Sequence, residues 1–476
     1  MPANNSVKQN IPTDIAIPKF AKRSFLLISS SVIRLSAQLI IIFLFSRQLP
    51  LDAYGLYQSV WLYVNVMSVI ALFGLPSLIL SASASSVRQL ISENKIIFAI
   101  FFLLLNIVPL AYVLFAATEY SLTIKLLVIV ITVIQNIAIV TETIAIKNKK
   151  EKLVLISNLI FSTGFLACHL YILYSGYSLQ WILISITLLF LLKSLLLFWG
   201  VRTKQLLLPA AQAVPAKQWF YLGLTDITGV IFKWLDKWLI LAFISVTQFA
   251  MYFNGSYEIP IFGLMLSAVS NIMLVDMANT NKQELNTIKS LFEHSSLLLA
   301  SVVFPSFCFL FFYSNEFFTF IFSEKYAAAI PVFVVSIFVL PVRITNYTAV
   351  LQVNNRNDLI IKGALIDLLL AIVFMAILYP LLHLPGLAMA FVLSTYVQAG
   401  YYLWHTAKLL NKKISYFFPF KRLLLLLLLS ATITGLLYYI GTVFTNEQNL
   451  LMGIIACSAL IIVLLWYRLK RVKKLI

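Results

Sequence analysis

Long apolar runs separated by short polar segments fill the chain from residue 24 to residue 467. Each run holds about 20 residues or more, which is the length that an α-helix needs to cross the hydrocarbon core of a bilayer. The pattern therefore predicts an all-α, polytopic membrane protein with about 14 transmembrane helices. These helices are expected at residues 24–47, 54–83, 96–118, 121–146, 153–174, 178–201, 218–246, 249–278, 291–313, 327–353, 358–379, 384–407, 423–443 and 449–467.

The amino-acid composition supports this interpretation. Hydrophobic residues make up 61% of the chain and charged residues 11%, and the mean hydropathy is +0.96. Soluble domains are typically about 45–50% apolar and about 25% charged. The three cysteines lie far apart in apolar runs, so neither a disulfide nor a metal site is expected from them. No Gly-x4-Gly-Lys-Ser/Thr sequence is present, so we expect no nucleotide hydrolysis. No predicted external loop exceeds about 15 residues, which leaves little room for catalytic groups, so we do not expect an enzyme.

The net charge of +18 suggests a nucleic-acid partner, but the distribution of the cations argues against one. If residue 1 starts in the cytoplasm and the helices alternate, 27 of the 35 lysines and arginines fall on the cytoplasmic side and three on the other. Such a bias follows the positive-inside rule. We therefore expect a multi-pass protein of the cell inner membrane, with both termini in the cytoplasm. The remaining five cations lie within predicted helices.

The first half of the chain repeats in the second half. Shifting residues 24–95 by 195 positions brings SRQLPLDAYGLY (46–57) onto LAFISVTQFAMY (241–252). The match predicts two parallel six-helix lobes around a central cavity, where repeat-built transporters place their substrate. The expected parts are a cytoplasmic tail (1–23), an N-lobe (24–201), a cytoplasmic linker (202–217), a C-lobe (218–410), two extra helices (411–468) and a basic tail (469–476).

The predicted helix at 218–246 carries four charged residues in a segment long enough to cross a bilayer. A charge at the centre of a membrane helix costs about 2.5–3.5 kcal/mol on insertion scales. Such residues are tolerated where they pair with one another or face a wet interior. Asp226, Lys233 and Lys237 share one helical face and Asp236 flanks it. We expect them to line a polar cavity, with pairing of Lys233 and Asp236 inside the helix as the structural alternative.

Other cations also lie within predicted helices. Arg34 and Gln38 are one turn apart on the first helix, and Gln38 aligns with Lys233 in the repeat. Snorkelling to the headgroups is the structural alternative for Arg34, which lies about 15 Å of helical rise inside its helix. Arg343 follows Pro341, and proline kinks helices. The candidate cavity cations are Arg34, Lys233, Lys237 and Arg343.

Acids and amides within predicted helices are candidates for ion coupling and hydrogen bonding. Glu258 lies one turn after Asn254 and beside Pro260, where it would carry a proton or a sodium ion. Glu142 is expected at the cytoplasmic surface, and Lys193 has no acidic neighbour one turn away. The coupling or counter-ion candidates are Asp226, Asp236 and Glu258, and the polar substrate-binding candidates are Gln38 and Asn254. The four histidines show no ligand spacing, so no metal site is expected.

Four motifs in order resemble those of the polysaccharide-biosynthesis flippases of the O-antigen type. They are SRQLPLDAYGLYQ with LFGLPSLIL, DKWLILAFISVTQFAMYFNGSYEI, SEKYAAAIPVF and LPGLAMAFVLSTY, and the resemblance covers about residues 20–410. Lys237 stands where that family commonly has arginine, and Ala250 where it commonly has glycine.

The resemblance implies the fold of the multidrug/oligosaccharidyl-lipid/polysaccharide (MOP) exporter superfamily. It implies transport of undecaprenyl-pyrophosphate-linked oligosaccharide, such as an O-antigen repeat unit of lipopolysaccharide, from the cytoplasmic to the periplasmic leaflet. The expected partners are the lipid-linked oligosaccharide, membrane lipid and other polysaccharide-assembly membrane proteins. In the related lipid II flippases the last two helices form a groove for the lipid tail, and residues 411–468 are compatible with that role.

The predicted cavity is net basic, because its four candidate cations outnumber its two aspartates, Asp226 and Asp236. Cations of this kind hold pyrophosphate groups, whereas an exporter of organic cations would need an acidic or aromatic cavity. The first hypothesis is therefore a flippase that works by alternating access. The second is a cation-coupled exporter of small molecules or drugs with the same fold, and the third is a membrane scaffold that transports nothing.

Overall fold

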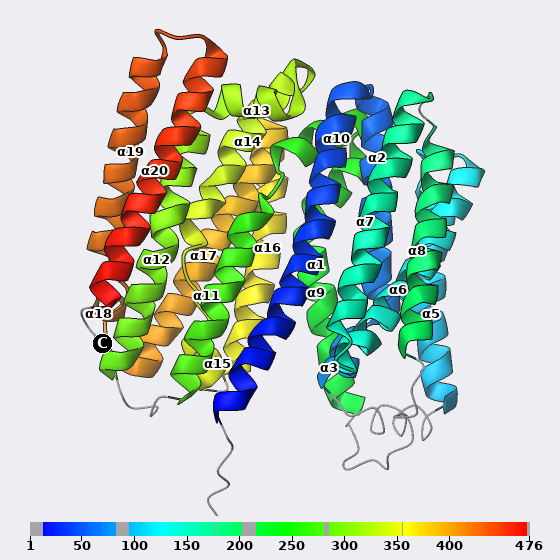
Figure 1. Cartoon of the computed structure of the whole chain (residues 1–476), viewed down its shortest axis with the longest axis horizontal. Coiled ribbons are helices and arrows are strands. Elements are labelled where there is room, and N and C mark those ends of the chain that lie inside the picture. Colours follow the sequence, from blue (N-terminus) through cyan, green and yellow to red (C-terminus); the bar gives the residue numbers. More distant parts are fainter. Residues whose placement is uncertain are drawn as a thin grey trace, which may run out of the picture. The chain divides into compact units, whose positions relative to one another are not determined.

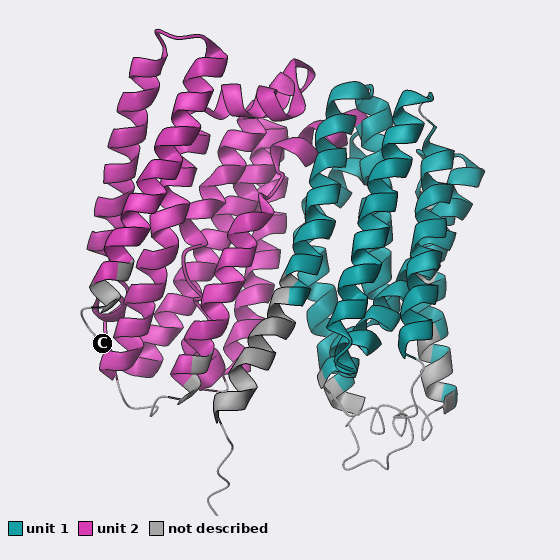
Figure 2. Cartoon of the chain, viewed as in Figure 1, with its two compact units in different colours: residues 1–246 teal, residues 247–476 magenta. Residues whose placement is uncertain are grey.

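Helices make up nearly all of the protein in a computed structural model that describes residues 13–81, 95–176, 178–201, 216–279, 285–354 and 356–473 (Figure 1). No strand occurs in these ranges, so the prediction of an all-α protein is confirmed. The chain divides into two compact units, residues 1–246 and residues 247–476 (Figure 2).

The first unit is a group of mostly long helices. The helix α6 packs against α8, α1 packs against α7, and α2 packs against α5, α6 and α9. The helices of this unit are α1 (Thr13–Gln48), α2 (Leu51–Leu72), α3 (Leu75–Ser81), α5 (Lys95–Ala116), α6 (Leu122–Lys147), α7 (Glu151–Tyr174), α8 (Leu179–Val201) and α9 (Ala216–Phe243).

The second unit contains more and shorter helical pieces. The helix α16 packs against α17, and α12 contacts α11, α19 and α20. The helices of this unit are α10 (Val246–Gly255), α11 (Pro260–Asn279), α12 (Leu285–Phe312), α13 (Ser314–Phe322), η2 (Glu324–Ala329), α14 (Ile330–Ser336), η3 (Ile337–Val342), α15 (Ala349–Val353), α16 (Asn357–Leu382), α17 (Leu384–Leu410), α18 (Ile414–Phe417), α19 (Phe420–Gly441) and α20 (Asn446–Lys473).

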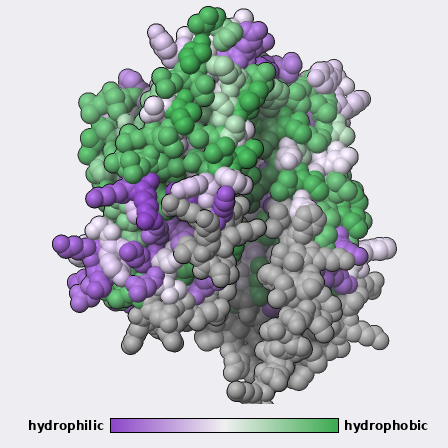
Figure 3. Space-filling view, turned by 60° about the vertical axis from the view of Figure 1, so that its left-hand side comes forward, coloured by the Kyte–Doolittle hydropathy of each residue, from purple (hydrophilic) through white to green (hydrophobic). Residues whose placement is uncertain are grey.

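Many of these helices are suited to a bilayer. In the described ranges ten are long and apolar enough to cross a membrane, or eleven if the bent pair α10 and α11 counts as one span. Each of the other predicted spans also falls on a helix: α5, which holds a shorter apolar stretch, α9 with its four charges, and α17. One face of the surface carries a broad hydrophobic area with hydrophilic residues gathered above and below it (Figure 3). The protein is therefore a multi-pass membrane protein.

Three segments that the sequence predicts as continuous helices are broken. The segment 54–83 breaks at Phe73 and Gly74, whose φ angles are +39° and +71°. The segment 249–278 bends by 51° between α10 and α11. The segment 327–353 is a succession of η2, α14 and η3 that stops after Val342, and α15 starts only at Ala349. Apolar length alone gives no signal for such breaks, because each piece remains apolar.

The internal repeat is visible in the helix ends. α1 ends at Gln48 and α9 at Phe243, and α2 begins at Leu51 and α10 at Val246, so both pairs differ by the 195 positions of the sequence repeat. The breaks that follow, after α2 and after α10, differ in position by less than that shift. The first helix of each repeat therefore keeps the register that the sequence predicts.

The predicted boundaries of the lobes and tails remain predictions from the sequence. The compact units divide after residue 246, so α9, which the repeat places in the C-lobe (218–410), groups with the first unit. Residues 202–215 of the predicted linker and residues 1–12 of the predicted tail lie outside the described residues. The rest of that tail belongs to α1, which begins at Thr13, and α20 extends into the predicted basic tail as far as Lys473.

The break between α2 and α3 is where α9 comes closest to them. A Cβ atom on Gly74 would lie 2.7 Å from the Cα atom of Gly223 on α9. The Trp219 indole Nε1 donates a hydrogen bond of 2.9 Å to the carbonyl oxygen of Phe73, the residue that follows α2. Carbonyl groups at helix ends generally need partners from outside the helix. The two glycines thus permit a backbone contact, and Trp219 completes the hydrogen bonding of the broken helix.

We predict that Gly74→Ala lowers the stability of the protein by about 1–3 kcal/mol, because the new methyl group collides with α9 and the positive φ disfavours a side chain. The measurement is the thermal unfolding midpoint of the purified protein in a neutral detergent. Gly229→Ala is the control, since Gly229 lies on the facing helix α9 and has open space around its Cβ position. Equal midpoints for Gly74→Ala and the wild type would contradict this description of the contact.

Candidate functional site

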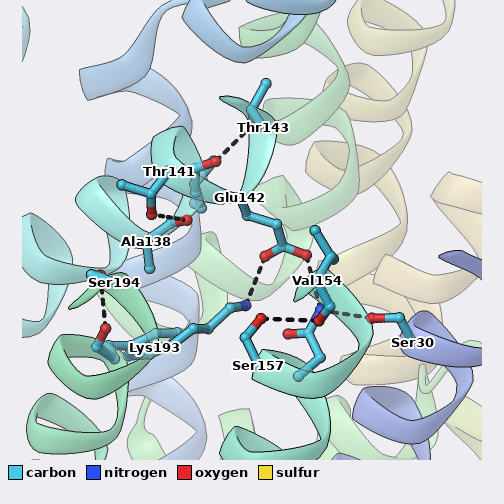
Figure 4. Close-up of polar contacts among 12 residues, drawn as sticks. Ser30, Ala138, Thr141, Glu142, Thr143, Val154, Ser157, Lys193 and Ser194 are labelled. Carbon is cyan, nitrogen blue, oxygen red and sulfur yellow. Dashed lines mark hydrogen bonds and ion pairs between the residues drawn. The ribbon is translucent and has the colours of Figure 1, made fainter. Parts of the chain in front are cut away.

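A network of polar side chains joins four helices inside the first unit (Figure 4). The Lys193 Nζ on α8 lies 2.7 Å from Glu142 Oε2 on α6, and the two side chains are 4% and 17% exposed. The Asn158 Nδ2 on α7 donates hydrogen bonds to Glu142 Oε1 at 2.9 Å and to Ser30 Oγ on α1 at 2.8 Å. Glu142 is therefore the centre of a buried network that ties α1, α6, α7 and α8 together.

The surroundings of this network explain how charges are tolerated there. The neighbouring hydroxyl groups of Thr141, Thr143 and Ser194 each donate to a carbonyl oxygen of the preceding helical turn, so they do not compete for Glu142. The ammonium group of Lys193 also lies 5.5 Å from the centre of the Phe161 ring. The hydrogen bond from Asn158 to Glu142 and the Phe161 ring beside Lys193 thus add to the ion pair. A buried ion pair needs such additional contacts to offset the cost of desolvation.

Arg34 adds a second positive charge to this region. It is half-buried on α1, and its charge acts on both Glu142 and Lys193. No carboxylate lies within ion-pair distance of Arg34 among the described residues, and the nearby Glu142 is engaged by Lys193 and Asn158. The three charged groups together carry one excess positive charge.

Gln38 lies one turn further along α1. It is half-buried and makes no hydrogen bond to any residue that the structure describes. On one face of α1, Arg34 thus has no ion-pair partner and Gln38 no hydrogen-bond partner among the described residues.

The four charges of α9 make separate contacts in the structure. Asp236 is buried and accepts a hydrogen bond from the backbone N–H of Lys237, whose Nζ lies 3.3 Å from Asp236 Oδ2. Asp226 accepts a hydrogen bond of 3.0 Å from Ser77 Oγ on α3. The proposed pair of Lys233 with Asp236 is not formed, because Lys233 is exposed and its Nζ lies 5.6 Å from the centre of the Trp234 ring. The carboxylates of α9 are therefore held by neighbours other than Lys233.

Two candidates of the second unit meet in the structure. The guanidinium of Arg343 donates to both carboxylate oxygens of Glu258, at 2.7 and 3.0 Å. Arg343 stands where η3 ends, and Glu258 lies in the break between α10 and α11, so each comes from an interrupted span. The arginine side chain is 24% exposed and the glutamate 45%. Asn254, the remaining candidate of this unit, is fully buried on α10.

The Glu142–Lys193 pair is the contact that sequence reasoning missed. Glu142 was expected at the cytoplasmic surface, and the structure instead places it in the buried network. The two residues are 51 positions apart, so helical spacing cannot connect them. The available signal was one buried charge of each sign on two helices of the same half.

Solved structures similar to this chain are transporters. One is the lipid II flippase MurJ in an inward closed conformation, with 17% identity, a TM-score of 0.66, and coverage of 93% of this chain and 99% of that chain. Another is an inward-facing multidrug resistance MATE family transporter of the MOP superfamily, with 15% identity, a TM-score of 0.54, and coverage of 79% and 97%. A third is a MOP superfamily transporter from Pyrococcus furiosus, described as having a binding pocket of reverse polarity that suggests a different function, with 13% identity, a TM-score of 0.55, and coverage of 83% and 96%.

No family model and no curated protein matches the sequence. The chain has the fold of MOP-superfamily transporters, as the resemblance implied. Membership of the O-antigen flippases within that superfamily stays a prediction. The three similar structures are named as transporters or as a flippase and not as enzymes, which agrees with the expectation of a transport protein.

We predict that Glu142→Leu destabilises the protein by about 3–5 kcal/mol, because it leaves Lys193 buried without a partner. The double variant Glu142→Leu, Lys193→Met should recover most of this loss, since it removes both charges. Asp358→Asn is the control, because its pair with Arg356 is 44–50% exposed and such pairs contribute about 0–1 kcal/mol. Denaturant unfolding of the purified proteins measures all three, and an additive double variant would contradict the pairing.

Proposed function

We propose that this protein moves an anionic, lipid-linked glycan across the cell inner membrane, with undecaprenyl-pyrophosphate-linked oligosaccharide as the substrate class. The observation that supports this most is the state of Arg34, which is half-buried in a membrane helix without an ion-pair partner among the described residues. A guanidinium remains charged at any physiological pH. An ionised residue in that setting marks a ligand or ion pathway rather than packing.

The network around Glu142 supports the same assignment. Glu142 contacts both Lys193 and Asn158. Its negative charge therefore balances that of Lys193, and the positive charge of Arg34 remains unbalanced among the described residues. A guanidinium binds phosphate oxygens through two parallel hydrogen bonds, which makes it well suited to a pyrophosphate. We assign the pyrophosphate to Arg34 and assign Gln38, one turn away, to hydrogen bonding with the adjacent sugar.

The roles proposed for the other candidate cations depend on whether each has a carboxylate partner. Lys233 is exposed and without an ion pair in the described part of the chain, so it would contribute directly to anion binding. Lys237 and Arg343 already have carboxylate partners, Asp236 and Glu258. Each would contact the substrate only by exchanging that partner during alternating access, and the released carboxylate would then be free to take up a proton or a sodium ion.

The similar structures leave two substrate classes within this fold. MurJ is named as a flippase of lipid II, and the MATE protein is named for multidrug resistance. The second candidate is therefore a cation-coupled exporter of small molecules. The excess positive charge at Arg34 favours an anionic substrate, because organic cations are bound by acidic or aromatic groups. The proposal further places both termini in the cytoplasm, in line with the positive-inside distribution of cations.

We predict that Arg34→Ala abolishes transport of the lipid-linked glycan, while Arg34→Lys retains part of it because the charge remains but the two parallel hydrogen bonds do not. The measurement is the amount of surface polysaccharide in cells, together with mass spectrometry of accumulated lipid-linked intermediates. Arg356→Ala is the control, since that exposed arginine lies outside the proposed site. Normal polysaccharide in cells with Arg34→Ala and normal protein levels would remove the proposed role.

A further inference from the structure

The short helix α18 of the second unit, which lies between α17 and α19 in the chain, is anchored by buried aromatic side chains. Phe417 is 1% exposed, and its ring centre lies 5.4 Å from that of Phe292 on α12. The ring of the buried Phe418 lies 6.0 Å from that of Tyr347. Because these two neighbouring aromatic residues anchor the backbone, the position of the preceding Tyr416 is set by the fold.

Tyr416 brings two lysines together. Lys289 on α12 has its Nζ 5.0 Å from the centre of the Tyr416 ring, and Lys412, in the turn before α18, has its Nζ 5.6 Å from the same centre. The Tyr416 hydroxyl donates a hydrogen bond of 3.1 Å to Asn286 Oδ1, which fixes the ring against α12. Two ammonium groups from segments more than 100 residues apart in sequence therefore meet at one aromatic ring.

The charges at this place have no acidic partner among the residues that the structure describes. Neither Lys289 nor Lys412 has a carboxylate within ion-pair distance in the described ranges, and the same is true of the exposed Lys413. Glu293, one turn after Lys289 on α12, is paired with Arg422 instead. Two like charges on one ring repel each other, and an anion placed beside the ring would relieve that repulsion.

The next turns of the chain are apolar and exposed. Phe420, Leu424 and Leu425, at the start of the membrane-spanning helix α19, are 50%, 57% and 66% exposed. On a spanning helix such side chains face acyl chains. The two lysines at the Tyr416 ring could hold a charged headgroup, and the apolar surface that follows along the chain could contact the lipid tails.

We propose that Lys289, Lys412 and Tyr416 form a binding site for the phosphate of an anionic membrane phospholipid whose acyl chains lie along the start of α19. Lysines near the ends of membrane helices usually reach separate headgroups independently. Here the convergence on one anchored tyrosine creates a site for a single anion. The adjoining apolar surface favours a lipid over an acidic soluble peptide, which would leave it unused. This site is independent of the transported substrate proposed above.

The test is lipid binding by the full chain, purified in a neutral detergent and titrated with phosphatidylglycerol or phosphatidylcholine, with bound lipids counted by native mass spectrometry. We expect a preference for phosphatidylglycerol that Lys289→Gln with Lys412→Gln weakens by about 30-fold, from the usual contribution of two lysines to anionic-lipid binding. Lys289→Arg with Lys412→Arg should keep the preference, because arginine retains both the charge and the affinity for an aromatic ring.

Lys325→Gln is the matched control, since Lys325 also lies over a tyrosine, Tyr326, at 5.6 Å. Unlike Tyr416, that ring has one described lysine over it. It should bind phosphatidylglycerol like the wild type. The proposal is overturned if the variant Lys289→Gln with Lys412→Gln binds phosphatidylglycerol as the wild type does. It is also overturned if this variant's binding of phosphatidylcholine falls to the same extent as its binding of phosphatidylglycerol. Displacement of phosphatidylglycerol by a soluble polyglutamate peptide at equal affinity would assign the site to an acidic protein partner and overturn it as well.

Discussion

The cost of an unpaired charge inside a membrane helix governs the polar architecture of this protein. Glu142 meets that constraint for Lys193, and Asn158 donates hydrogen bonds to Glu142 and to Ser30, so the network joins four helices. The same constraint gives Arg34 its significance, because the carboxylate that would neutralise it is already engaged. In the function proposed above, an external anion takes the place of the missing carboxylate beside Arg34.

Backbone groups obey a related constraint at the broken helices. A carbonyl that loses its helical partner in the membrane must find another donor. At the end of α2 this donor is Trp219, which reaches the carbonyl oxygen of Phe73. The breaks on either side of the Arg343–Glu258 pair place charged side chains at points where the helices α10 and η3 end. Interrupted spans thus supply the polar positions that continuous apolar helices lack, and they are suited to local rearrangement.

The sequence predicts the helical architecture well and the charge partners poorly. Apolar length and the 195-residue repeat place the helices, and the ends of α1 and α9 keep that register, because both features depend on local sequence. The break at Gly74 depends instead on a tertiary contact with Gly223. Partners such as Glu142 and Lys193 depend on how helices far apart in sequence pack. The Lys233–Asp236 pair, the structural alternative for α9, is not formed, because Asp236 pairs with its sequence neighbour Lys237 instead.

The central claim is that Arg34 gives its surroundings a positive, water-accessible character. It is tested most directly by Gln38→Cys, one turn from Arg34, in a protein whose three native cysteines are replaced by alanine. Its rates of modification by negatively and positively charged water-soluble thiosulfonates of similar size are compared with those of a free thiol. The account predicts a preference for the negative reagent that disappears when Arg34→Gln is added. A preference for the positive reagent, or no reaction with either, would contradict it.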